Sequence, residues 1–191
     1  MPPVRCRIVL VLLALALATT VAVTDEIARD TDKSWEFGAY AMASRYSNST
    51  HFDSAPGFGI RGGYHLKAFH EFEADFDTAT ANHATDSNLQ FDVTKFGASY
   101  LRMFLIKGHE RIIPFAIFGL GLMEVDDGTD SDSSAVYRAG GGFKYWFSPH
   151  VGLRFDARIW RWHGKGEVVV SDPFYSFDAT LGVTFLAGGT K

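Results

Sequence analysis

The sequence predicts an all-β fold: an eight-stranded antiparallel transmembrane β-barrel, connected as an up-and-down meander, after an N-terminal signal peptide. Eight stretches alternate apolar and polar residues with the period of two that a strand requires. In the stretch Val151–Ile159 every second residue is apolar, whereas Arg154, Asp156 and Arg158 share the opposite face. A strand of this kind needs lipid on one side and a polar interior on the other, which is typical of a membrane barrel.

Residues 1–22 are expected to be the signal peptide. Arg5 and Arg7 precede an apolar run, and Ala16-Leu17-Ala18 or Thr20-Val21-Ala22 supplies a small-x-small cleavage pattern. The apolar run of 16 residues is shorter than the ~20 residues that a spanning helix needs. Cys6 leaves with this segment, so we expect a mature chain without a thiol, a disulfide or a cysteine-ligated metal.

The remaining chain is expected to be one domain: a periplasmic linker over residues 23–34, the barrel over 35–186 and a tail over 187–191. A content of 47% hydrophobic and 21% charged residues argues against disorder. The formal net charge of −4 becomes −6 without the two arginines of the leader, and there is no basic stripe. Nucleic acid is therefore not expected as a partner.

Period and turn residues divide the barrel into strands. The predicted strands are Trp35–Tyr46, Gly57–Leu66, Phe69–Thr80, Leu89–Leu105, Ile112–Val125, Ala135–Phe147, His150–Trp162 and Phe174–Leu186. The connections over residues 47–56, 81–88, 126–134 and 163–173 are long and polar, and those over 67–68, 106–111 and 148–149 are tighter. Outer-membrane barrels have short periplasmic turns and longer external loops, so both termini are expected in the periplasm.

Two strands are harder to interpret. The strand over Ile112–Val125 is apolar on both faces, so its period does not orient it. The strand over Leu89–Leu105 switches phase, with Phe91 and Val93 at odd positions but Phe96 at an even one. We expect a β-bulge near Thr94-Lys95 to explain this switch.

The inward faces collect ionisable residues of both signs. The predicted lumen network consists of Arg61, Glu71, Glu73, Asp75, Arg138, Lys144, Arg154, Asp156, Arg158 and Asp178. An eight-stranded barrel is only wide enough for its side chains to fill, and an unpaired ion there costs several kcal/mol. We therefore interpret the network as structural ion pairs rather than as a catalytic cluster.

The segment Ala139–Arg154 resembles the penultimate hairpin of the small OmpA/OmpX-like outer-membrane barrels, the outer membrane protein β-barrel domain family. A glycine-rich strand with an aromatic end and a Ser148-Pro149 turn precede a strand with inward arginines. In the last predicted strand, Thr180, Gly182 and Phe185 are similar to the family's terminal assembly signal. The resemblance implies an integral protein of the Gram-negative outer membrane. The tail after Leu186 departs from the family's frequent aromatic end.

Some barrels of this class modify lipid A, and the residues bear on this enzymatic alternative. The His-x-Ser pair of a deacylase is missing after His163, because Gly164-Lys165 follows. Loop residues around His51, Asp53 and Ser54, or His83, Asp86 and Ser87, offer the His, Asp and Ser of an acyl transferase. Both stretches are interpreted more simply as hydrophilic loops. The acidic segment Asp126–Asp132 lacks the spacing and closing glutamate of a calcium loop.

Two further alternatives are a narrow pore and a barrel that holds one small hydrophobic ligand. Inward charges disfavour the ligand barrel, and a filled bore disfavours the pore. The prediction is thus a non-enzymatic, monomeric barrel with no catalytic residue, cofactor or metal. Its role is envelope integrity or surface contact, and its expected partners are lipopolysaccharide, the barrel-assembly machinery and an external partner at the loops.

Overall fold

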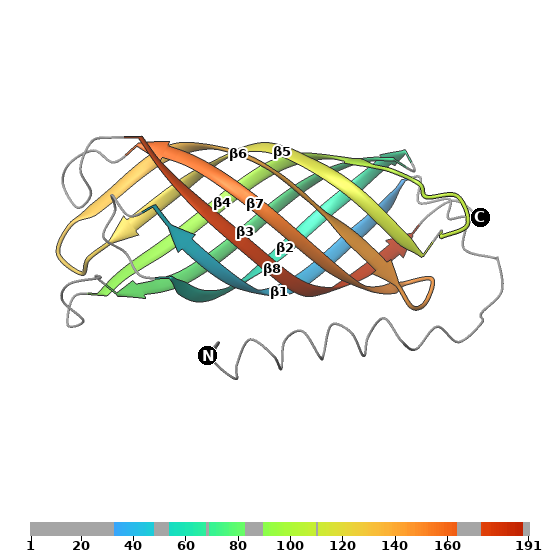
Figure 1. The fold of residues 1–191 in the computed structure, drawn as a ribbon, viewed down its shortest axis with the longest axis horizontal. Helices are drawn as coiled ribbons and strands as arrows, with labels where there is room; N and C mark the ends of the chain where they lie inside the picture. Colours follow the sequence, from blue (N-terminus) through green and yellow to red (C-terminus); the bar gives the residue numbers. More distant parts are fainter. Residues whose placement is uncertain are drawn as a thin grey trace, which may run out of the picture.

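The computed structural model describes residues 33–47, 54–67, 69–82, 90–109, 111–163 and 173–188. Its strands are β1 (Ser34–Tyr46), β2 (Ala55–Lys67), β3 (His70–Asn82), β4 (Gln90–Met103), β5 (Ile112–Asp126), β6 (Ser131–Trp146), β7 (Val151–His163) and β8 (Pro173–Gly188). Each strand pairs antiparallel with the next, and β1 pairs with β8, so the sheet closes into a barrel (Figure 1). The predicted eight-stranded antiparallel barrel in meander order is confirmed.

No helix in the described part of the chain is long and apolar enough to cross a membrane. The predicted signal peptide, the linker up to residue 32 and the last three residues of the tail lie outside the described residues.

The two ends of the barrel differ in what they carry. Ser34 and Gly188 are register partners, so the first and last described strands begin and finish at the same end. We call this the terminal end; the connections over residues 68–69, 104–111 and 147–150 return the chain there. We call the opposite end the loop end; it is where the strands joined by residues 47–54, 83–89, 127–130 and 164–172 stop.

All eight predicted strands are present, and only one boundary differs by more than two residues. β6 begins at Ser131, not at Ala135, because Ser131 pairs with Asp126 and continues the ladder. The expected long loop over residues 126–134 is therefore wrong, and the connection is the short turn over residues 127–130. Serine and aspartate favour turns, so their presence in this segment concealed the strand.

The expected bulge at Thr94-Lys95 is also wrong. The register of β4 with β3 runs without interruption from Gln90 to Arg102, and odd residues face the lumen throughout. Phe91 and Val93 are buried on the same face as Lys95. The phase switch in the sequence therefore reflects a change in the chemistry of the lumen along the strand, from an apolar layer to an ionic one.

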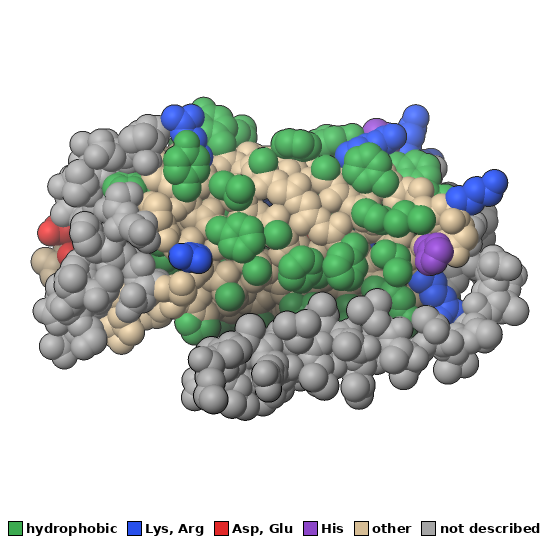
Figure 2. Space-filling view, viewed as in Figure 1, with side chains coloured by type: hydrophobic (Ala, Val, Ile, Leu, Met, Phe, Trp, Pro, Cys, Tyr) green, Lys and Arg blue, Asp and Glu red, His purple; other side chains and the backbone are tan. Residues whose placement is uncertain are grey.

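The outer wall of the barrel is apolar. Phe58, Ile60, Leu120 and Tyr137 are each at least 60% exposed, and similar side chains cover the face seen in Figure 2. The sequence period did not show which face of β5 points outward; in the structure Phe118, Leu120 and Leu122 do. Each such side chain costs about 1.5–3 kcal/mol to expose to water rather than to an apolar surrounding. The wall is thus matched to lipid.

Clusters of apolar side chains lie in the lumen toward both ends. A cluster that includes Tyr46, Phe91, Trp160, Trp162 and Phe174 lies at the loop end. A smaller cluster of Leu101, Met103, Phe115 and Ile117 lies at the terminal end. The ionisable side chains lie in the lumen between these two clusters and next to them.

Candidate functional site

The structure places all ten predicted network residues inside the barrel. Each is at most 5% exposed, and the set is Arg61, Glu71, Glu73, Asp75, Arg138, Lys144, Arg154, Asp156, Arg158 and Asp178. They come from five strands, because the period of two turns every second side chain of β2, β3, β6, β7 and β8 inward. The lumen is therefore the main concentration of buried charge in the described part of the chain.

Asp156 lies at the centre of the network. Its carboxylate accepts hydrogen bonds from Arg61 at 2.5 Å, from Arg154 Nε at 3.0 Å and from Arg158 at 3.3 Å. The hydroxyl of Thr180 on β8 donates a fourth, at 2.9 Å. Four donors around one carboxylate compensate for the loss of water, which is the condition for a stable buried ion.

Two further carboxylates extend the central group. Arg138 donates with both terminal nitrogens to Asp75, a bidentate contact that fixes its plane. Glu73 accepts from Arg154 and, at 3.4 Å, from Arg158. Arg158 also approaches Asp75 at 3.5 Å. These shared partners link β2, β3, β6 and β7 across the bore.

A second ionic group lies toward the loop end, around Lys95. Its ammonium donates to Asp178 at 2.6 Å, and Asp77 lies 3.9 Å away. The same ammonium faces the ring of Trp160 at 5.4 Å. A cation over an indole face adds electrostatic attraction in a dry site, so this group ties β4 to β7 and β8.

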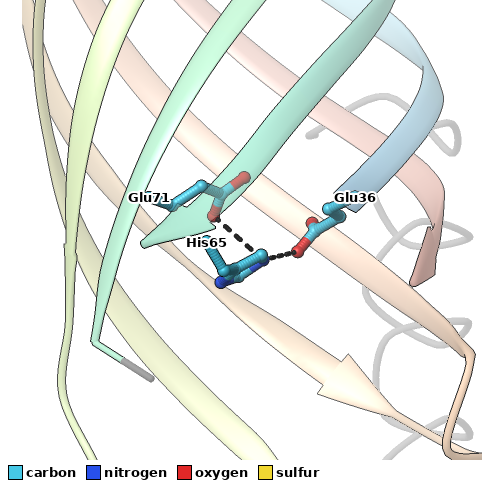
Figure 3. A group of neighbouring side chains, drawn as sticks. All are labelled: Glu36, His65 and Glu71. Atoms are coloured by element: carbon cyan, nitrogen blue, oxygen red, sulfur yellow. Dashed lines mark hydrogen bonds and ion pairs between the residues drawn. The ribbon is translucent and has the colours of Figure 1, made fainter. Parts of the chain in front are cut away.

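A third group lies at the terminal end and contains Glu36, His65, Glu71 and Lys144. Figure 3 shows His65 between the two carboxylates, with Nε2 2.9 Å from Glu36 and 3.7 Å from Glu71. Their ligand-type atoms lie within 4.8 Å of one another, a spacing that a metal ion could bridge. The Lys144 ammonium donates to Glu36 at 2.6 Å and to Glu71 at 2.5 Å. A side chain of the protein thus already supplies the cation.

The predicted network lacks four members of these groups. They are Glu36, His65, Asp77 and Lys95. Glu36 lies near the start of β1, whose other inward residues include Tyr40 and Met42, so the sequence of this strand shows no ionic face. Lys95 fell at the supposed bulge. The alternation of the strands already places His65 on the inward face with Arg61, and Asp77 on that with Asp75, although neither was included in the predicted network.

The three residues of the predicted assembly signal have different surroundings. Thr180 faces the lumen, and Phe185 faces outward, 52% exposed. A Cβ at Gly182 would lie 2.5 Å from the Cβ of Tyr40, so this position requires glycine where β8 passes β1. Recognition by the assembly machinery stays a prediction.

The loop end carries an exposed acidic turn. The Asp127 carboxylate accepts the backbone N–H groups of Thr129 at 2.8 Å and of Asp130 at 2.9 Å. These hydrogen bonds hold the pKa of Asp127 below its usual value. Gly128, with φ of 86°, makes the reversal, which an L side chain would strain.

The residues considered for lipid A chemistry lie mostly outside the described part of the chain. His51, Asp53, His83, Asp86 and Ser87 are outside the described residues, and so is the side chain of His163. Ser54 is described and exposed. These positions therefore establish no catalytic arrangement.

Comparisons with known proteins agree with this architecture. The family model of the outer membrane protein beta-barrel domain matches residues 9–185. The solved structure of Neisserial surface protein A is 20% identical with a TM-score of 0.57, covering 80% of this chain and 95% of that one. The N-terminal barrel domain of Pseudomonas aeruginosa OprF is 19% identical with a TM-score of 0.55, covering 82% and 98%.

Ail, the attachment invasion locus protein of Yersinia pestis, is 15% identical with a TM-score of 0.54, covering 82% of this chain and 99% of that one. The comparison with curated proteins gives no match. At these identities the structures show a shared fold, while the family model spans most of the sequence. The chain therefore belongs to the outer membrane protein beta-barrel domain family and is an integral protein of the Gram-negative outer membrane.

Proposed function

We propose that the protein is a non-enzymatic barrel whose rigid wall presents the loop end to the outside of the cell for surface contact. The observation that carries the proposal is the ion-paired lumen. In the described part of the chain, the inward arginines and lysines each contact a carboxylate, and clusters of apolar side chains lie toward both ends. Such side chains hold a barrel together and leave the exposed segments to make contacts.

The lengths of the connections support the orientation. Three of the four segments at the loop end have at least seven residues between strands, whereas two of the three at the terminal end have four or fewer. External loops of outer-membrane barrels are usually the longer ones. We therefore infer that the loop end faces outward and that both termini face the periplasm.

The chemistry of the loop end favours a weak, polar contact. The turn over residues 127–130 is fully exposed and contains two aspartates, and Asp126 precedes it. Its partner would accordingly present cations or hydrogen-bond donors. Ail, which shares this fold, is an attachment invasion locus protein of Yersinia pestis. A related surface role for this chain is part of the proposal.

Loop replacement tests the proposal. In one variant the segments over residues 127–130 and 164–172 become short Gly/Ser turns, and in a matched control only the terminal-end turn over residues 147–150 is replaced. We expect heat-modifiable gel migration in both, showing a folded barrel, and loss of adhesion to host cells or matrix only in the first. Equal adhesion by both variants would contradict the loop-scaffold role.

The lipid A-modifying alternative needs its own measurement. Cells that lack the whole protein are compared with complemented cells by mass spectrometry of lipid A. A non-enzymatic barrel leaves the acyl pattern unchanged. An acyl pattern that changes on deletion and returns on complementation would establish an enzyme instead.

A further inference from the structure

A row of basic side chains crosses three neighbouring strands on the outer wall at the terminal end. Lys67 on β2 is the register partner of His70 on β3, and His70 is the partner of Arg102 on β4. Their neighbours Glu71 and Leu101 face the lumen, so His70 and Arg102 face out, where they are half-buried. A register shift between His65 and Lys67 pairs the exposed Lys67 with the outward His70. Three basic groups thus lie side by side at the terminal end of the outer wall.

Two of these groups, His70 and Arg102, are organised by contacts with each other and with aromatic rings. Arg102 donates a hydrogen bond to Nε2 of His70, whose Nδ1 lies 2.6 Å from the hydroxyl of Tyr100. The guanidinium of Arg102 lies 6.0 Å from the centre of the Phe69 ring. The ring of Phe72 packs on Tyr100 with their centroids 5.6 Å apart. His70 and Arg102 are therefore held in a defined arrangement, and the register of β2 with β3 places Lys67 beside His70.

Neither Lys67 nor Arg102 has a carboxylate partner among the described residues. This contrasts with the lumen, where each described arginine and lysine forms an ion pair, such as Arg138 with Asp75 and Lys144 with Glu71. Arg102 lies near an aromatic ring without a carboxylate partner among the described residues, so its guanidinium can bind an anion from outside the chain. The planar guanidinium can donate two parallel hydrogen bonds to phosphate oxygens.

The position of the row identifies where that anion would come from. Leu66, Phe72 and Phe104 surround it and are each about half exposed, as expected at the edge of the lipid-facing belt. At this level a membrane presents the phosphates of its headgroups. The row would meet the phosphate of a lipid whose acyl chains cover the neighbouring aromatic rings.

The charge of the whole terminal end agrees with an anionic surface. Its other exposed ionisable side chains in the described ranges are Lys33, Lys107, His109 and His150. Exposed acids such as Asp92, Glu124 and Asp127 lie at the loop end. On the face shown in Figure 2, red side chains lie at the left end and purple ones toward the right, whereas blue side chains lie at both ends; the exposed cations of the loop end include Arg45 and Arg161. Glu110 lies outside the described residues.

We propose that Lys67 and Arg102 form a binding site for the phosphate of an anionic phospholipid, with His70 holding the guanidinium of Arg102 in place. Lys67 supplies a point charge, Arg102 supplies a pair of parallel donors, and Phe69 and Phe72 contact the apolar part of the lipid. The site is independent of the loop contacts proposed above, and the orientation inferred there only decides that the lipid belongs to the periplasmic leaflet.

Native mass spectrometry of the folded, detergent-solubilised protein tests the site. Dioleoylphosphatidylglycerol and dioleoylphosphatidylcholine are titrated separately, and the apparent affinity for the first bound lipid is measured. Each membrane-surface cation contributes about fivefold in affinity, so Lys67→Gln/Arg102→Gln should weaken phosphatidylglycerol binding about 25-fold. The matched control is Arg45→Gln/Arg161→Gln, which removes two exposed outward cations from the loop end and should change affinity less than about twofold.

Several outcomes would overturn the proposal. They are equal affinity of the wild type for both lipids, an unchanged preference in Lys67→Gln/Arg102→Gln, and an equal loss in the control pair. Displacement of the lipid by millimolar inorganic phosphate would assign the site to free phosphate. A dimer that Lys67→Gln/Arg102→Gln dissociates would assign it to a second copy of the chain.

If the double variant does not fold, Arg102→Lys is the second test. It keeps the charge but removes the planar guanidinium, and it should still weaken phosphatidylglycerol binding. Wild-type affinity in Arg102→Lys would contradict the role of Arg102.

Discussion

The substitution Asp156→Asn tests the lumen network most directly. Asparagine keeps the size of the side chain but removes its charge, while Arg61, Arg154 and Arg158 stay in place around it. Asp156 is fully buried, so these arginines would lose their shared counter-ion without gaining water. Removing one partner of a buried pair costs about 3–5 kcal/mol. We expect a loss of that size in the free energy of unfolding.

Urea unfolding in lipid vesicles measures this loss. The buried Trp160 and Trp162 report the transition by fluorescence, and gel migration without heating reports the folded fraction. Glu124→Gln is the matched control, because it makes the same change of acid to amide at an exposed position of β5 and should cost less than about 0.5 kcal/mol. The result that refutes the reasoning is an Asp156→Asn barrel within about 1 kcal/mol of wild type, which would mean that water reaches the carboxylate.

A double-mutant cycle then assigns the energy to one pair. Arg61 donates to Asp156 at 2.5 Å from β2, across the bore from β7. Arg61→Gln combined with Asp156→Asn should show a coupling of about 1–3 kcal/mol. Additive losses would instead place the stabilisation in Arg154, Arg158 or Thr180.

Three further predictions concern single positions. Gly97→Leu should lower the free energy of unfolding by about 1–3 kcal/mol in the same urea assay, because a side chain at this position would displace the guanidinium of Arg138. The control Gly62→Ala should be near neutral, because the nearest neighbour of a Cβ at Gly62 is 3.6 Å away. Thr180→Val should cost about 1–3 kcal/mol by removing a donor from the central carboxylate, and an unchanged midpoint would show that other donors suffice. The pKa of the Asp127 carboxyl is lowered in the folded turn, so its ionised form stabilises the turn. This stabilisation is fully present above the pKa of Asp127 in the unfolded chain and is lost as the pH falls through the lower pKa of the folded chain. A titration of the Asp127 carboxyl chemical shift at or above the ordinary pKa range would contradict this prediction.

The sequence alone determined the barrel. The period of two, with ions on one face and aromatic residues on the other, has one stable arrangement in a membrane, because only a closed sheet satisfies every backbone hydrogen bond in lipid. The same alternation placed Arg154, Asp156 and Arg158 on the inner face without reference to any other strand. The alternation of residues was sufficient to predict the strands and the face of each side chain, because both depend on one strand at a time.

The tertiary structure decided which ions meet and how far the ladders extend. Asp156 lies 95 residues from Arg61 in sequence, and Lys144 lies 108 residues from Glu36, so their pairing follows from the registers of the closed sheet. The pairing of Ser131 with Asp126 overrode local turn preference, and the apolar layer around Phe91 explained a phase switch that looked like a bulge. The outward row of Lys67, His70 and Arg102 likewise exists only because three strands place one residue each at the same level.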